Sequence, residues 1–272
     1  LQRGVGTSTN GAGAFGASIN LTTDSNSEKS YAILANSMGS FNTQKHTVKF
    51  STGQIRDRFE LAGRLSKIDT DGFIDRASSG LKSHFLQAVF QERKTKVKEL
   101  AFGGFERTYQ SWFGIDGATL ETNRTYNPAG INYDDAGNVK GYYKDQVDNY
   151  NQDHYQIHWE QGINAYWSFA LGLNYTYGRG YYQELNDLWH DQNVSLSGKT
   201  SAAYLMLPDK SATETENVTQ KWLDNDFYVA NLMTRFQKRK QTLHLGLSFS
   251  SYVGDHFGTL IWAQNAGGAL PD

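Results

Sequence analysis

Two polar stretches of the sequence, residues 108–152 and 178–225, combine aromatic rings with arginine. Aromatic rings stack on flat groups and attract cations, and arginine binds carboxylate-like anions through two hydrogen bonds. Such a set fits a polar ligand with flat or anionic groups, although packing between loops explains any single member equally well. The candidate ligand-binding residues are Trp112, Arg124, Tyr126, Tyr142, Arg179, Tyr181, Trp189 and Trp222.

Residues that could support catalysis or metal binding lack the necessary context. There is no Gly-x-Ser-x-Gly motif, so we do not expect an enzyme. His154 and His158 lie in an alternating segment, where a spacing of four residues separates them by about 13 Å, too far for one metal ion. Residues 69–72 and 224–226 resemble fragments of calcium loops without the closing glutamate. We therefore expect no catalytic residue, no metal site and no cofactor.

The segment RGVGTSTNGAGAFGASINLTT, residues 3–23, is rich in glycine and small residues. Glycine at this density serves positive φ angles or close approach of two backbones. A P-loop would need a following lysine, and a dinucleotide fingerprint would need a strand before the glycines and a helix after them. Neither is present, so the segment predicts a tight loop that leads into a short strand near Ile19 and Leu21.

The elements that must position these residues are β-strands. Aromatic residues make up 14% of the chain, and 27 glycines stand against three prolines, which favours an all-β protein. About nine segments alternate between apolar and polar residues, and their length of about 9 to 12 residues matches a tilted membrane-spanning strand. The predicted strands are 31–38, 45–52, 58–67, 81–90, 96–107, 153–161, 166–177, 226–235 and 241–253.

The lengths of the connections alternate. Short turns are predicted at 53–57, 92–95, 162–165 and 237–240, and long connections at 69–80, 108–152, 178–225 and from 254 onward. Short turns on the periplasmic side and long loops outside are typical of an outer-membrane β-barrel. Aromatic residues near the strand ends would form two girdles at the membrane interfaces. The alternative is that these rings fill the core of an antiparallel sandwich.

Composition excludes several classes of protein. The 272 residues contain no cysteine, so neither disulfides nor thiolate metal sites can form. The net charge is −2 and the basic residues are scattered, which argues against nucleic acid as a partner. The mean hydropathy is −0.60, and no apolar run reaches the roughly 18 residues of a membrane helix. A membrane barrel stays possible because its lipid-facing residues alternate with polar ones.

The glycine-rich segment resembles the C-terminal end of the plug domain in TonB-dependent outer-membrane receptors. The positions that match are Arg3, Gly4, Gly11, Gly16, Ile19 and Asn20. Downstream segments resemble the barrel of these receptors, particularly those of Bacteroidetes, and extend the resemblance over essentially the whole chain. They include GSFNT (39–43), GRLSKIDTDGFIDRAS (63–78), RTYNP (124–128), DNYNQDHYQ (148–156), GRGYY (178–182), KWLDNDFY (221–228) and GDHFG (254–258).

The resemblance implies residues 1–28 as the end of a plug and residues 29–272 as the first part of a transmembrane barrel with long extracellular loops. Such a barrel has about 22 strands, so we expect the chain to be part of a longer receptor. It also implies energy-dependent uptake across the bacterial outer membrane, driven by the TonB-ExbB-ExbD complex. An iron-siderophore is the first expectation for the ligand, followed by cobalamin, haem, oligosaccharide or peptide. A surface lipoprotein is a further possible partner.

Two other classes of protein stay open from the sequence. The first is a soluble or surface-anchored β-rich module that binds carbohydrate or acts as an adhesin. The second is an outer-membrane lipid hydrolase, which would require an active serine. Both accommodate alternating strands, but the soluble module does not explain why every second connection is long.

Overall fold

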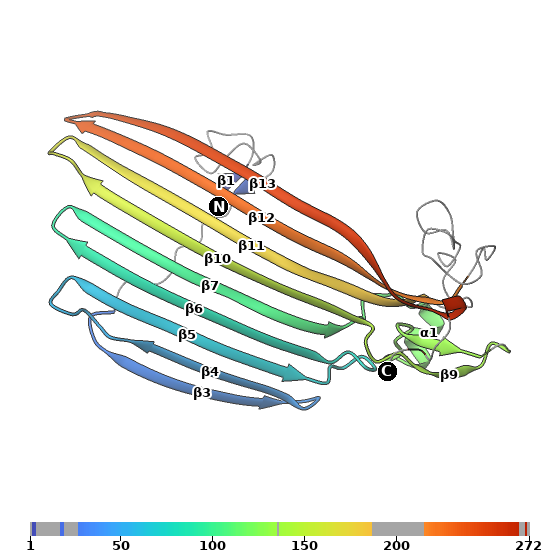
Figure 1. Cartoon of the computed structure of the whole chain (residues 1–272). Coiled ribbons are helices and arrows are strands. Elements are labelled where there is room, and N and C mark those ends of the chain that lie inside the picture. Colours follow the sequence, from blue (N-terminus) through green and yellow to red (C-terminus); the bar gives the residue numbers. More distant parts are fainter. Residues whose placement is uncertain are drawn as a thin grey trace.

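The computed structural model describes residues 2–3, 17–18, 27–134, 136–186, 215–266 and 270. Nine antiparallel strands form one curved sheet, and each strand lies beside its neighbour in the chain (Figure 1). Apart from short elements, the described residues place no second layer on this sheet. The sandwich alternative, which needs two packed sheets, is therefore wrong.

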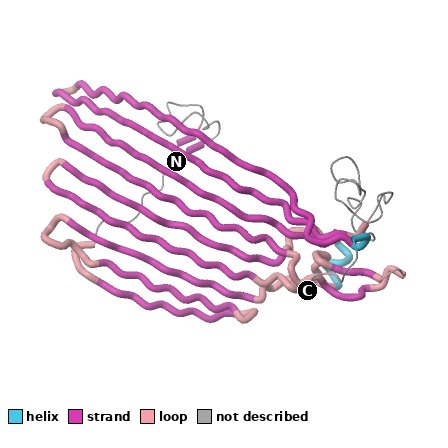
Figure 2. Tube along the Cα trace, viewed as in Figure 1, coloured by secondary structure: helices cyan, strands magenta, loops and turns pink. Residues whose placement is uncertain are grey.

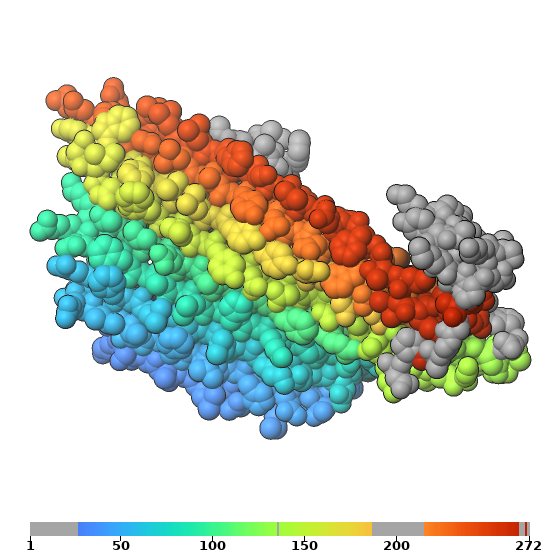
Figure 3. Space-filling view, in the orientation of Figure 1, coloured from blue at the N-terminus to red at the C-terminus, as the bar shows by residue number. Residues whose placement is uncertain are grey.

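The nine predicted strands are all present. From one edge of the sheet to the other they are β3 (Tyr31–Gly39), β4 (Thr43–Ser51), β5 (Phe59–Thr70), β6 (Ser79–Glu92), β7 (Thr95–Tyr109), β10 (Val147–Gly162), β11 (Trp167–Asn186), β12 (Asn217–Lys238) and β13 (Gln241–Ala263). Side chains of neighbouring strands form one continuous surface in the space-filling view (Figure 3). No helix in the described ranges is long and apolar enough to cross a membrane.

The connections have very different lengths at the two ends of the sheet (Figure 2). One end, the short-turn end, carries residues 52–58, 93–94, 163–166 and 239–240. Arg93 and Arg239 have φ angles of 52° and 54°, as two-residue hairpin turns require. The other end, the long-loop end, carries residues 40–42, 71–78, 110–146 and 187–216. The predicted alternation is confirmed, with the exception of the tight turn at residues 40–42.

The two faces of the sheet differ in polarity. Leu171, Leu232 and Leu247 lie side by side on one face, which we call the apolar face. Gln156 and Asn174 lie on the opposite, polar face and are joined by a 3.0 Å hydrogen bond that the Gln156 amide donates. Because successive strand residues point to opposite faces, this division extends along each strand. The sheet thus has the two-sided pattern that the sequence predicts.

The strands are longer than predicted, and β11, β12 and β13 exceed the prediction most. β11, β12 and β13 have 20, 22 and 23 residues. Arg179, Tyr181 and Trp222 therefore belong to strands, and their predicted place in an extracellular loop is wrong. Cross-strand hydrogen bonds continue beyond the point where the apolar alternation ends, so periodicity alone underestimates these strands.

Short elements complete the described structure. The two-residue strands β1 (Gln2–Arg3) and β2 (Ala17–Ser18) pair with each other. At the long-loop end, α1 (Gly117–Thr122) is followed by the hairpin of β8 (Ile131–Tyr133) and β9 (Val139–Tyr142), and η3 (Gln264–Ala266) follows β13. Of the six plug-motif positions, Arg3 lies in β1. Outside the described residues are Gly4, Gly11, Gly16, Ile19 and Asn20.

Candidate ligand-binding site

A cavity of about 640 Å³ is open on the polar face near the long-loop end. Its polar and aromatic lining comes from five adjacent strands, β7, β10, β11, β12 and β13. Gly180 keeps it hollow, because a Cβ atom there would collide with the Asn149 carbonyl and the Tyr150 ring. The side chains of interest in its lining are those of Glu106, Asp148, Tyr150, Tyr182, Lys221 and His256.

Hydrogen bonds and ring contacts orient these side chains. The Lys221 ammonium lies 5.1 Å from the centre of the Tyr182 ring and 3.3 Å from a carboxylate oxygen of Glu184. The Tyr150 hydroxyl donates to Gln152 over 3.2 Å. Carboxylates that accept, an ammonium that donates and exposed ring faces together suit a polar ligand with hydroxyl groups or flat rings. The cavity can therefore bind a ligand of this kind.

The loop of residues 110–146 is held in place by a buried hydrogen-bond network. Gln110 is fully buried, and its amide donates to the Gln183 carbonyl over 3.0 Å. The Gln146 amide donates to the Gln110 side chain over 3.1 Å, and the Asn127 amide donates to the Gln110 carbonyl over 2.9 Å. Buried polar groups that are all satisfied specify a single arrangement. The loop is therefore fixed to the ends of β10 and β11.

Tyr143 lies near the end of this anchored loop, four residues before β10. Its hydroxyl accepts a 2.6 Å hydrogen bond from the Gln183 amide, and its carbonyl accepts one of 2.9 Å from the Tyr109 hydroxyl. Only 2% of Tyr143 is exposed. Burial raises the pKa of its phenol to about 12, because the phenolate would lose its hydration.

The structure separates the residues that the sequence predicts as ligand-binding. Tyr181 and Trp222 belong to the strands that line the cavity, and the Trp112 ring lies near it, edge-on to Tyr182 at 6.2 Å. The Tyr142 ring instead packs under the guanidinium of Arg76, whose carbon atom lies 4.0 Å from the ring centre. Arg124 is exposed and Tyr126 is half-buried in the loop after α1. Trp189 lies outside the described residues.

The other three candidates, Arg179, Tyr181 and Trp222, lie together but on the apolar face. The Tyr181 and Trp222 rings are 4.6 Å apart, and the Arg179 guanidinium lies 5.2 Å from the Trp222 ring. Their neighbours along the chain, Tyr182 and Lys221, point into the cavity. Successive residues of a strand point to opposite faces, so extending strand 166–177 to residue 182 would have placed Tyr181 and Tyr182 on different faces.

None of the six side chains named above in the cavity lining is among the predicted ligand-binding residues. Glu106, Asp148 and Tyr150 come from two strands whose register places Glu106 directly opposite Tyr150. His256 belongs to β13 beyond its predicted end. The spacing of these residues along the sequence does not predict that they lie together, because strand pairing brings them together. No group of three or more His, Asp or Glu side chains in the described part of the chain could hold a metal ion.

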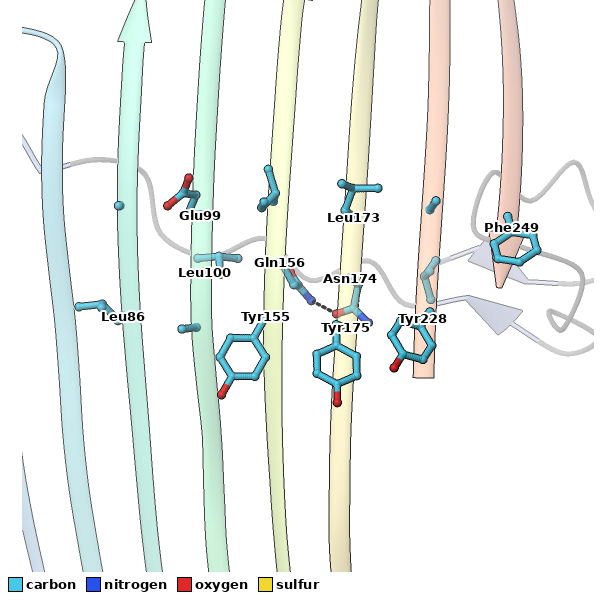
Figure 4. Close-up of a pocket in the computed structure, with 15 residues that line it drawn as sticks. Leu86, Glu99, Leu100, Tyr155, Gln156, Leu173, Asn174, Tyr175, Tyr228 and Phe249 are labelled. Carbon is cyan, nitrogen blue, oxygen red and sulfur yellow. Dashed lines mark hydrogen bonds between the residues drawn. The ribbon is translucent and has the colours of Figure 1, made fainter. Parts of the chain in front are cut away.

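A second cavity, of about 680 Å³, lies on the apolar face (Figure 4). Tyr155, Tyr175 and Tyr228 stand in a row at one side of it, with ring centres 6.1 and 4.9 Å apart. Its lining is mainly hydrocarbon, with Glu99 as the one carboxylate among the lining residues. A hollow of this composition suits apolar chains rather than a polar ligand.

Solved structures with the same arrangement of strands are receptors for iron chelates. The chain is similar to BauA, the ferric preacinetobactin receptor of Acinetobacter baumannii, with a TM-score of 0.64 and 12% identity over 92% of this chain and 34% of that one. It is also similar to the siderophore receptor PiuA of the same species, with a TM-score of 0.63 and 13% identity over 93% of this chain and 34% of that one. For the ferric-catecholate import receptor Fiu of E. coli K12, the TM-score is 0.58 and the identity is 14% over 91% of this chain and 35% of that one.

The chain has the fold of part of the barrel of these receptors. It spans about a third of the length of these receptors. No protein-family model and no curated protein sequence matches it. In the barrel, the apolar face of the sheet corresponds to the outside of the wall and the polar face to the lumen. The 640 Å³ cavity then belongs to the lumen side.

Proposed function

We propose that the chain is the first part of the barrel of an outer-membrane receptor that imports a ferric chelate, with residues 1–28 as the end of its plug domain and residues 29–272 as barrel. The single observation that carries the proposal is the fold, which is similar to that of three receptors named for siderophores or ferric chelates. The proposed activity is transport, without a catalytic residue.

The division of the sheet into two faces supports placement in a membrane. Leu245, Leu247 and Phe249 on the apolar face are 55%, 73% and 65% exposed. A water-soluble protein rarely exposes an apolar surface of this extent, whereas lipid would cover it. The short-turn end would face the periplasm and the long-loop end the outside.

The cavity lined by Tyr150, Tyr182 and Lys221 is the proposed contact of this wall with the ligand. It lies near Trp112 of the anchored loop, whose ring is 6.2 Å from that of Tyr182, so a ligand captured by the loops would meet it. Trp112 and Tyr126 remain candidates for contact from the loop itself. The energy for release would come from the TonB-ExbB-ExbD complex acting on the plug, as in the family that the sequence resembles.

Uptake of iron by whole cells tests this proposal. A strain that lacks the receptor, complemented with the full-length gene, should accumulate radioactive iron supplied as ferric siderophores, and deletion of tonB or dissipation of the proton-motive force should abolish the accumulation. Tyr182→Ala in the cavity should reduce uptake, and Ser168→Ala, on the same face near the short-turn end, is the matched control. Failure to accumulate any ferric chelate would contradict the proposed ligand class.

A further inference from the structure

Three aromatic side chains form a strip on the apolar face at the long-loop end. Tyr181 lies 4.6 Å from Trp222, and the Trp222 ring is 5.8 Å from Phe257 and almost parallel to it, with 7° between the planes. Register pairs Trp222 with Tyr181 on one side and with Phe257 on the other. We call Tyr181, Trp222 and Phe257 the outer aromatic strip.

The outer aromatic strip lies well beyond the apolar part of its face. Six residues separate Tyr175 from Tyr181 along β11, a distance of about 20 Å at the rise of an extended strand. Charged residues occupy the rows between them, including Arg179 and Asp224, which form an ion pair of 3.5 Å. The row of Tyr155, Tyr175 and Tyr228 therefore marks the last apolar level, and the strip stands above it in the polar zone.

The chemistry of the strip favours a sugar over an anionic group. Parallel aromatic rings offer flat surfaces to the C–H faces of a saccharide ring. Within strands β11 to β13, the residues around them on this face include three carboxylates, Asp224, Asp226 and Asp255, and one cation, Arg179. This excess of carboxylates would repel a phosphate but can accept hydrogen bonds from sugar hydroxyls.

The position of the strip separates it from the imported ligand. Residue 181 contributes to the cavity lining, but the Tyr181 and Tyr182 side chains lie on opposite faces of the sheet. A ligand in the lumen therefore meets the Tyr182 ring, and a molecule outside the barrel meets the Tyr181 ring. The strip also continues the face that lipid would cover lower down. Its nearest neighbours in a membrane are therefore the headgroups of outer-leaflet lipids.

We propose that the outer aromatic strip binds the saccharide headgroup of an outer-leaflet glycolipid, an inference that rests on the outer-membrane placement proposed above. Trp222 and Phe257 form the stacking platform, Tyr181 extends it, and Arg179 and Asp224 hydrogen-bond to the sugar hydroxyls. Bound glycolipid would fix the height of the barrel in the membrane at this edge.

The full-length receptor in lipid nanodiscs provides the test. One set of discs contains lipopolysaccharide with its core sugars and the other contains lipid A without them, and native mass spectrometry counts the glycolipid retained. The wild type should retain the sugar-bearing form in preference. Trp222→Leu and Tyr181→Ala should lower this retention roughly five-fold, the equivalent of one lost stacking contact. Trp222→Phe should preserve most of it, and Tyr182→Ala, on the lumen side, is the matched control.

Several results would overturn the proposal. Equal retention of both glycolipids by the wild type would show that the sugar is not recognised. Unchanged retention in Trp222→Leu would show that the outer aromatic strip is not the binding site. Loss of a co-purifying protein in Trp222→Leu, with glycolipid retained, would make the strip a protein interface. Heat-dependent migration on gels reports whether each variant folds, and Arg179→Gln replaces Trp222→Leu if that variant does not. A wild type that never enters the membrane would instead contradict the proposed function.

Discussion

The Gln183 amide donates a 2.6 Å hydrogen bond to the Tyr143 hydroxyl and thereby joins strand β11 to the loop of residues 110–146. The side-chain oxygen of Gln183 accepts a second bond, of 2.6 Å, from Gln220 in the next strand. One buried glutamine thus links two strands and the loop. The arrangement makes the loop part of the wall rather than a free lid.

Gln183→Leu should release the loop. The substitution leaves the Tyr143 hydroxyl and the Gln220 amide without their partner, and a buried unsatisfied group costs roughly 1 to 3 kcal/mol. Hydrogen exchange of residues 110–146 in the full-length receptor should accelerate accordingly. Gln87→Leu, at a buried position of the polar face in β6, should leave exchange in the loop unchanged. Equal acceleration in both variants would mean that the anchoring is not local.

Alkaline pH should loosen the same loop through Tyr143. Its pKa in the folded protein is about 12, above the ordinary value of 10.0, because the side chain is buried. Between these pH values the unfolded state loses the proton first, so the folded loop loses stability as the pH rises from 10 to 12. Protection of the loop amides should fall over this interval in the wild type. In Tyr143→Phe the part of this fall that comes from the Tyr143 phenol should be missing. An identical pH profile in both proteins would contradict the role of Tyr143.

Arginine should be tolerated on one face of β11 and not on the other. Leu171→Arg places a cation on the apolar face and should destabilise the membrane-inserted protein by about 2 to 4 kcal/mol near the midplane. Asn174→Arg places it on the polar face, where water is accessible, and should be mild. Leu245→Arg in β13 should behave like Leu171→Arg. Unfolding in vesicles measures the three free energies, and similar values would refute the assignment of faces.

Glu99 is a charged residue on the apolar face, and its replacement by an apolar residue should increase the stability of the protein. It lies between Ala88 and Ile157 in register, and no hydrogen bond or ion pair joins it to another described residue. A lone carboxylate facing lipid is unfavourable, so Glu99→Leu should raise the free energy of unfolding by about 1 to 2 kcal/mol. The matched control is Glu160→Leu on the polar face beside Lys96, where no gain is expected. A loss of stability in Glu99→Leu would indicate that Glu99 has a partner in the whole receptor.

The strands could be predicted from the sequence and the grouping of residues in the cavity could not, for one physical reason. Alternation of apolar and polar residues is local, so segments such as 166–177 and 241–253 identify themselves. Above the apolar band, aromatic residues occupy both faces, as Tyr181 and Tyr182 do, and the local signal disappears while the strands continue. The cavity depends on register between distant strands, which places Glu106 opposite Tyr150. No spacing in the sequence encodes that pairing.

The central claim is that the sheet is a barrel wall with lipid on one face and the lumen on the other. Since the chain has no cysteine, single cysteines can be placed on β13 of a full-length receptor that lacks others, as Leu245→Cys, Leu247→Cys and His244→Cys. Each is labelled with a fluorophore and reconstituted in vesicles with spin-labelled lipid, which quenches only probes in contact with the acyl chains. We expect strong quenching at positions 245 and 247 and little at 244. Equal quenching at 244 and 245, or none at any position, would contradict the claim.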